Sequence, residues 1–161
     1  NGGGRLKDYS AKFAVSPFES LGDSLKGFKV NALFHKGSKN ESTLRNRIFA
    51  GLSYESKYVN AVCNYFNADN GSGAGPSRGE GFSIYSVVTP VEKFWGFLRM
   101  DRYDPDIFAG GDTHNRYIYG LGYQITKGVR MSVDHQYLEQ ERRSLTRQDE
   151  SIISVHTEAK F

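Results

Sequence analysis

The segment Asn115–Gln140 reads NRYIYGLGYQITKGVRMSVDHQYLEQ, two alternating runs separated by Lys127 and Gly128. Alternation with a period of two is the pattern of a β-strand whose two faces meet different surroundings, and a short turn with glycine joins antiparallel neighbours. The segment therefore predicts a hairpin of two long strands with unlike faces. The larger side chains are Tyr117, Tyr119, Leu121, Tyr123 and Ile125 in the first run and Val129, Met131, Val133, His135 and Tyr137 in the second.

The same alternation recurs along the whole chain, and no segment has the three-to-four spacing of an amphipathic helix. We expect one all-β domain over residues 1–161, built of about nine antiparallel strands. Each strand has about 11 residues or more, which matches the roughly 9–11 residues of a strand that crosses a bilayer better than the usual 5–6. The expected strands are 6–16, 25–36, 43–56, 58–68, 80–90, 94–104, 115–126, 129–140 and 150–161.

The composition narrows the class of protein. Hydrophobic residues make up 38% of the chain and aromatic residues 14%, with a mean hydropathy of −0.56. No apolar run approaches the roughly 20 residues of a membrane-spanning helix, but a barrel wall needs only alternate residues to be apolar. The net charge of +3 is too small to indicate a nucleic-acid partner.

The connections between the expected strands alternate between short and long. The short ones are Glu55–Lys57, Thr89–Lys93 and Thr126–Gly128, and the long ones are Lys36–Ser42, Asn67–Gly79, Asp104–Asn115 and Glu141–Asp149. Outer-membrane barrels have this asymmetry, with short periplasmic turns and longer extracellular loops. The first connection, Ser16–Lys26, is an exception because it is long on the short-turn side.

Alternation alone does not say which face meets water, since a soluble antiparallel barrel alternates with the opposite sense. Strand length, loop asymmetry and the position of aromatic residues near strand ends favour a membrane barrel, in which rings collect at the two interfaces. A soluble lipocalin-like barrel remains an alternative, with an apolar ligand inside. In it, the cavity would be lined by Tyr119, Leu121, Met131 and Val133.

The C-terminal strand, which alternates and ends in Phe161, resembles the assembly signal of Gram-negative outer-membrane barrels. The segments 25–30, 94–106 and 119–123 also look like strands of porins, especially the phosphate-selective porin-like group. This resemblance implies a passive channel for small hydrophilic solutes in the bacterial outer membrane, often a homotrimer. Porins of this kind have about 16–18 strands, so we expect the C-terminal part of a larger barrel. A complete eight-stranded barrel that acts through its loops is the alternative.

An inward-facing polar side places charged side chains in the lumen, where basic residues outnumber acidic ones. A mild preference for anions is therefore one hypothesis, and a solvated wall of balanced charges is the other. The expected pore-lining residues are Lys12, Lys29, Arg45, Arg47, Arg99, Asp101, Arg130, Asp134, Glu158 and Lys160.

Nothing in the sequence indicates an enzyme, a cofactor or a metal site. The acidic residues from Asp101 to Asp112 lack the spacing of an EF-hand loop, and the four histidines lie far apart in the sequence. Cys63 is the single cysteine, and no nucleophile, base and oxyanion motif comes together around it. The partners that we expect are outer-membrane lipid and small hydrophilic solutes.

Overall fold

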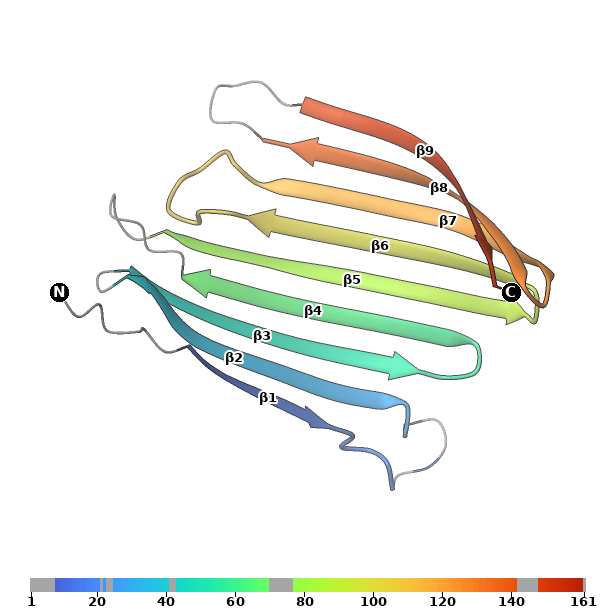
Figure 1. Ribbon diagram of the computed structural model, residues 1–161, viewed down its shortest axis with the longest axis horizontal. Helices are drawn as coiled ribbons and strands as arrows, with labels where there is room; N and C mark the ends of the chain where they lie inside the picture. Colours follow the sequence, from blue (N-terminus) through green and yellow to red (C-terminus); the bar gives the residue numbers. More distant parts are fainter. Residues whose placement is uncertain are drawn as a thin grey trace.

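The computed structural model describes residues 8–20, 22, 25–40, 43–69, 77–141 and 148–160. They form one antiparallel sheet in which each strand pairs only with its sequence neighbours (Figure 1), so the expected all-β, up-and-down architecture is confirmed. No helix in these ranges is long and apolar enough to span a membrane. The strands are β1 (Tyr9–Val15), β2 (Phe28–Asn40), β3 (Thr43–Glu55), β4 (Val59–Asp69), β5 (Arg78–Val91), β6 (Phe94–Asp104), β7 (His114–Thr126), β8 (Val129–Gln140) and β9 (Gln148–Ala159).

The strand ends agree with the expected ones to within a few residues, with one clear exception. The long connection expected over Lys36 to Ser42 was wrong, because β2 continues to Asn40 and β3 already begins at Thr43. The ladder continues through Gly37, which stands opposite Arg45. Strand pairing uses main-chain groups, so a polar and glycine-containing sequence does not prevent it.

The remaining connections keep the predicted asymmetry. Turns of two or three residues join β3 to β4, β5 to β6 and β7 to β8 at one end of the sheet. The longer connections from β4 to β5, β6 to β7 and β8 to β9 lie at the other end (Figure 1). The connection from β1 to β2, residues 16–27, is long and lies at the short-turn end, as the sequence predicts.

The sheet is a single layer without a dry interior. Among the described residues, Ala68 is the only hydrophobic residue that is buried. Large apolar side chains such as Phe13, Leu98 and Val155 are 60%, 53% and 68% exposed. In the described ranges, the edge strands β1 and β9 pair with β2 and β8 but not with each other. The sheet is therefore an open wall of strands.

The wall is curved. On a flat sheet, Tyr85 of β5 and His156 of β9 would lie roughly 19 Å apart, at about 4.8 Å per strand. Both instead line one open cavity of about 780 Å³, because β9 bends across the end of the sheet (Figure 1). The face that lines this cavity carries the polar alternate residues and is called the concave face below. The opposite face, which carries most of the exposed apolar side chains, is the convex face.

Candidate functional site

All ten residues that the sequence predicts for the lumen side lie on the concave face. The strand register shows this, because residues directly opposite each other in neighbouring strands share a face. Asp101, for example, stands opposite both Ser83 and Arg116. The ten residues are Lys12, Lys29, Arg45, Arg47, Arg99, Asp101, Arg130, Asp134, Glu158 and Lys160.

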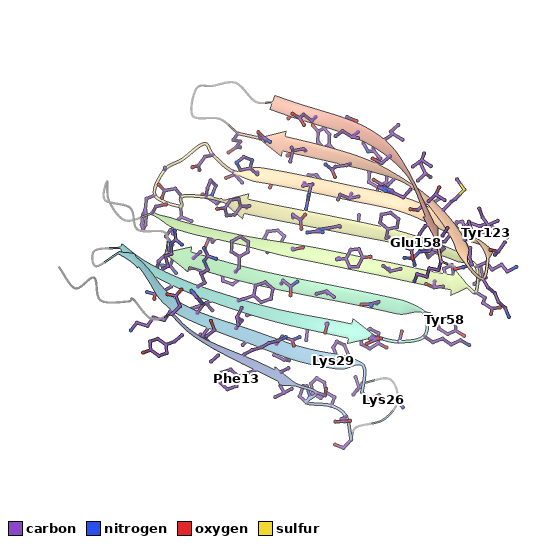
Figure 2. The ribbon with its side chains drawn as sticks, in the orientation of Figure 1. Phe13, Lys26, Lys29, Tyr58, Tyr123 and Glu158 are labelled. Carbon is purple, nitrogen blue, oxygen red and sulfur yellow. The ribbon has the colours of Figure 1, made fainter. Side chains whose placement is uncertain are left out.

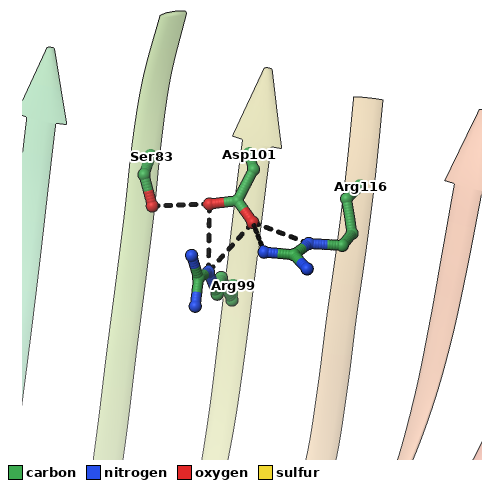
Figure 3. Close-up of polar contacts among 4 residues, drawn as sticks. All are labelled: Ser83, Arg99, Asp101 and Arg116. Carbon is green, nitrogen blue, oxygen red and sulfur yellow. Dashed lines mark hydrogen bonds and ion pairs between the residues drawn. The ribbon is translucent and has the colours of Figure 1, made fainter. Parts of the chain in front are cut away.

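Asp101, near the end of β6, is the centre of a charged cluster on the concave face (Figure 3). Ser83 Oγ donates a hydrogen bond of 2.6 Å to Asp101 Oδ1, and Arg99 Nε donates to the same oxygen at 3.0 Å. From β7, Arg116 donates to Asp101 Oδ2 through Nε at 2.9 Å and Nη2 at 2.6 Å. One carboxylate therefore links three strands and neutralises part of the charge of two guanidinium groups.

A second cluster joins β8 to β9. Asp134, one of the few buried polar side chains among the described residues, lies 2.7 Å from His156 Nε2. Arg130 donates to Glu158 through Nε and Nη2, and Lys160 Nζ lies 3.1 Å from the other carboxylate oxygen of Glu158. These contacts cross the last strand pair at the point where β9 bends.

The charges on β1 to β3 are less well compensated. Lys29 Nζ lies 3.1 Å from Glu55 Oε2, and both side chains are more than half exposed. Within the described residues, Lys12, Arg45 and Arg47 have no carboxylate partner. This part of the concave face is therefore basic, whereas most charged residues on the part formed by β6 to β9 belong to ion pairs.

Aromatic rings lie across glycines on the concave face. A Cβ atom built on Gly122 would collide with Cε2, Cζ2 and Nε1 of Trp95, and one built on Gly120 would collide with Cζ of Phe97. Register places each glycine directly opposite its aromatic residue. Both rings also line the cavity, together with Tyr85, Arg99, Arg130 and Glu158.

Sequence reasoning missed three residues of the candidate site: Arg116, His156 and Trp95. Arg116 lies two residues before Ile118 in the same alternating run. The sequence alone therefore indicates that Arg116 shares a face with Ile118. His156 is already on the polar side of its strand, but its link to Asp134 requires the register of β8 against β9. Trp95, near the start of β6, lies on the concave face over Gly122, and this placement requires the register of β6 against β7.

The convex face carries a band of uncharged, mostly apolar residues, called the convex band below. It is bordered at the long-connection end by a polar rim in which Arg78 Nε donates to Asn67 Oδ1 at 2.9 Å and Tyr137 Oη donates to Asp149 Oδ2 at 3.0 Å. Lys26, Tyr58 and Tyr123 lie near the short-turn end (Figure 2). From β2 to β9, the band consists of alternate residues in the ranges 28–34, 48–54, 59–65, 82–88, 94–100, 117–123, 129–137 and 151–159.

Aromatic side chains lie at both edges of the convex band. At the short-turn edge, the rings of Phe28 and Tyr54 are 4.6 Å apart between centroids. At the opposite edge, Tyr117 and Tyr137 stack with their centroids 6.4 Å apart. Rings at both borders of an apolar band are typical of membrane barrels.

The acidic residues after β6, considered as a possible metal site, form hydrogen bonds within the fold. Asp104 Oδ1 accepts a hydrogen bond from the backbone of Asp106, and Asp106 Oδ1 accepts one from the backbone of Phe108, so these acidic residues stabilise the turn after β6. In the described ranges, no group of His, Cys, Asp and Glu side chains is arranged to hold a metal ion. Cys63 is exposed on the convex face.

Comparison of the chain with protein-family models, with curated proteins and with solved structures found no match.

Proposed function

We propose that the chain forms part of the wall of an outer-membrane porin, with the convex face against lipid and the concave face along an aqueous lumen. In this role it catalyses no reaction. Small hydrophilic solutes diffuse past the concave face, which repels apolar molecules and acts on solutes by size and charge.

The convex band carries this proposal. Residues such as Ile153, Leu121 and Leu52 are 75%, 53% and 46% exposed on a single-layer sheet. A large apolar side chain gains roughly 1.5–3 kcal/mol on leaving water, and the described residues supply no second layer to cover the band. Lipid hydrocarbon chains can cover any uncharged, apolar surface without a specific shape. The convex band contains no Lys, Arg, Asp or Glu.

The height of the band fits a bilayer. Lys26 precedes β2 and Lys36 lies near its far end, and the convex-face residues between them, Phe28 to Phe34, are uncharged. The distance from Lys26 to Lys36 is about 33 Å at 3.3 Å per residue. With a strand tilt of about 40°, this corresponds to about 25 Å along the membrane normal, the usual height of the apolar band in such barrels.

The lipocalin-like alternative finds less support. It needs Tyr119, Leu121, Met131 and Val133 around an inner cavity. Their register places them on the convex face, and all four are at least 40% exposed there. The open cavity of about 780 Å³ lies on the other side and is lined by Arg99, Arg130 and Glu158. Leu121, Met131 and Val133 line only a smaller open pocket of about 270 Å³ on the convex face.

The strand directions bear on how the wall closes. β1 and β9 are both odd-numbered in an up-and-down sheet, so they run in the same direction. An antiparallel barrel that contains this wall therefore needs an odd number of further strands between β9 and β1. The nine strands already form one continuous sheet in sequence order. A barrel that contains all of them has at least ten strands, so this count favours a larger barrel over an eight-stranded one.

The direct test is the behaviour of the full-length protein in detergent and lipid. We expect it to require detergent for solubility and to give stepwise ion conductance in planar bilayers. A protein that is soluble and monodisperse without detergent would contradict the proposal.

A pair of variants tests which face meets lipid. Leu98→Arg, in the convex band, is expected to lower the stability of the protein in lipid vesicles by about 2–4 kcal/mol. Val62→Arg, on the concave face between Asn60 and Asn64, is the matched control and is expected to have little effect, since its charge stays in water. Equal effects, measured by urea unfolding in vesicles, would refute the assignment of the two faces.

A further inference from the structure

We propose that the cavity on the concave face of β5 to β9 is a binding subsite for neutral saccharides, formed around Trp95 and Phe97. This inference rests on the proposed function and names the class of solute that the wall selects. It follows from three properties of the cavity: aromatic faces, balanced charge and donors that remain available beside them.

The aromatic faces are the first property. Trp95 and Phe97 lie over Gly122 and Gly120, so the glycines let both rings approach the sheet. A ring that rests on the backbone turns its other face toward the cavity, which it lines. The C–H groups on one face of a pyranose ring are apolar and pack well against such a surface, while its hydroxyl groups point outward.

The charge balance is the second property. The charged residues around the cavity are Glu92, Arg99, Arg130 and Glu158, two basic and two acidic. Arg130 is paired with Glu158, and Arg99 is paired with Asp101. An anion would have to compete with these carboxylates for the guanidinium groups. A neutral hydroxyl group accepts a hydrogen bond without breaking either pair, so the cavity favours an uncharged ligand.

The available donors are the third property. The contacts of Arg99 with Asp101 use Nε only, and Figure 3 shows both terminal nitrogens of Arg99 directed away from the carboxylate. Arg130 uses Nε and Nη2 for Glu158, and its Nη1 makes no further bond within the described residues. Fixed N–H groups next to an aromatic face match the hydroxyl groups and the apolar face of a sugar. With about 780 Å³, the cavity has room for more than one sugar ring.

Trp95 is the only tryptophan of the chain, so its fluorescence reports directly on the subsite. The full-length protein in detergent is titrated with maltotriose and with cellotriose, and the same sugars are added to single channels in planar bilayers. We expect a saturable change in Trp95 emission and a saturable drop in ion current at matching concentrations. Polyethylene glycol of similar size is the control for simple obstruction and should not change the emission in a saturable way.

Two pairs of variants locate the binding. Phe97→Leu should weaken the response to the sugars by about fivefold to tenfold, the size expected for one aromatic stacking contact, whereas Tyr119→Leu on the convex face should not. Gly122→Ala should displace the indole and weaken binding similarly. Its matched control is Gly96→Ala, where a Cβ meets Leu121 at an ordinary distance of 3.5 Å.

The outcomes separate this inference from the porin proposal. If channels conduct but neither sugar gives a saturable response, or if sodium benzoate or inorganic phosphate gives a stronger one, the saccharide subsite is refuted and the porin proposal stands. If the protein gives no conductance, the porin proposal fails, whatever the sugars do to Trp95.

Discussion

The two halves of the concave face carry similar numbers of basic residues but differ in how those charges are compensated. On β1 to β3, counting Asp8 just before β1, four basic residues face two acidic ones. On β6 to β9, counting Lys160 just after β9, four basic residues face four acidic ones. The first set is Lys12, Lys29, Arg45 and Arg47 with Asp8 and Glu55, and the second is Arg99, Arg116, Arg130 and Lys160 with Asp101, Asp134, Glu150 and Glu158.

The charged residues of the two halves therefore have different effects. Paired charges hold strands together and give no net field, whereas unpaired charges in water act on passing ions. The aromatic residues Trp95 and Phe97 lie in the balanced half. We therefore expect the β1 to β3 half to set ion preference and the β6 to β9 half to set recognition of neutral solutes.

The largest effect on stability is expected from a substitution of Asp101, the carboxylate at the centre of the charged cluster in the balanced half. Asp101→Asn leaves Arg99 and Arg116 without their shared carboxylate, whose side chain is only 19% exposed. We expect a loss of about 2–3 kcal/mol in the free energy of unfolding, less than for a fully buried pair because both arginines are partly exposed. Urea unfolding in lipid vesicles measures it.

The double variant Asp101→Asn/Arg116→Gln removes one opposing charge as well and should recover part of the loss. If Asp101→Asn costs less than about 0.5 kcal/mol, the range of an exposed pair, the two halves do not differ in the way proposed.

A smaller effect is expected on ion preference from the basic half. Arg45→Gln combined with Arg47→Gln should lower the ratio of anion to cation permeability by about twofold or more, since each removed charge acts through water at short range. Reversal potentials under a potassium chloride gradient give this ratio. Lys57→Gln, in the turn between β3 and β4, is the control outside the lumen, and an equal shift for Lys57→Gln would argue against a local effect.

The smallest effect is expected for the exposed ion pair between Lys29 and Glu55 on the basic half. Glu55→Gln removes the partner of Lys29, but both side chains are more than half exposed. Exposed pairs contribute about 0–1 kcal/mol, so we expect a change of a few tenths of a kcal/mol in unfolding and a slight shift toward anions. A loss as large as that of Asp101→Asn would remove the contrast between the two halves.

The strands and the faces were predictable because side chains alternate strictly along an extended backbone. Once Tyr119 and Leu121 are assigned to one face, Gly120 and Gly122 must lie on the other. The same rule predicted that Lys29 and Asp134 share a face, and the register has both on the concave face. The rule failed at the end of β2, where a polar sequence was interpreted as a loop. The expected signal at Phe161 lies outside the described residues.

The contacts within the site were less predictable, because they depend on register between strands. Nothing in the sequence near Asp101 says that Arg116 and Ser83 stand beside it, since these residues lie on two other strands. The placement of Trp95 over Gly122 depends on the same alignment. A shift of one residue between β6 and β7 would have left every strand prediction intact and removed both contacts.

The sequence by itself determined which residues are strands and which side chains share a face, because a period of two is a local property of the extended chain. Only the tertiary structure decided that the polar face is concave, that charge is balanced on β6 to β9 and less well compensated on β1 to β3, and that β5 and β9 share a cavity. Those properties come from hydrogen-bond register and from the bend of β9, which relate residues far apart in the chain.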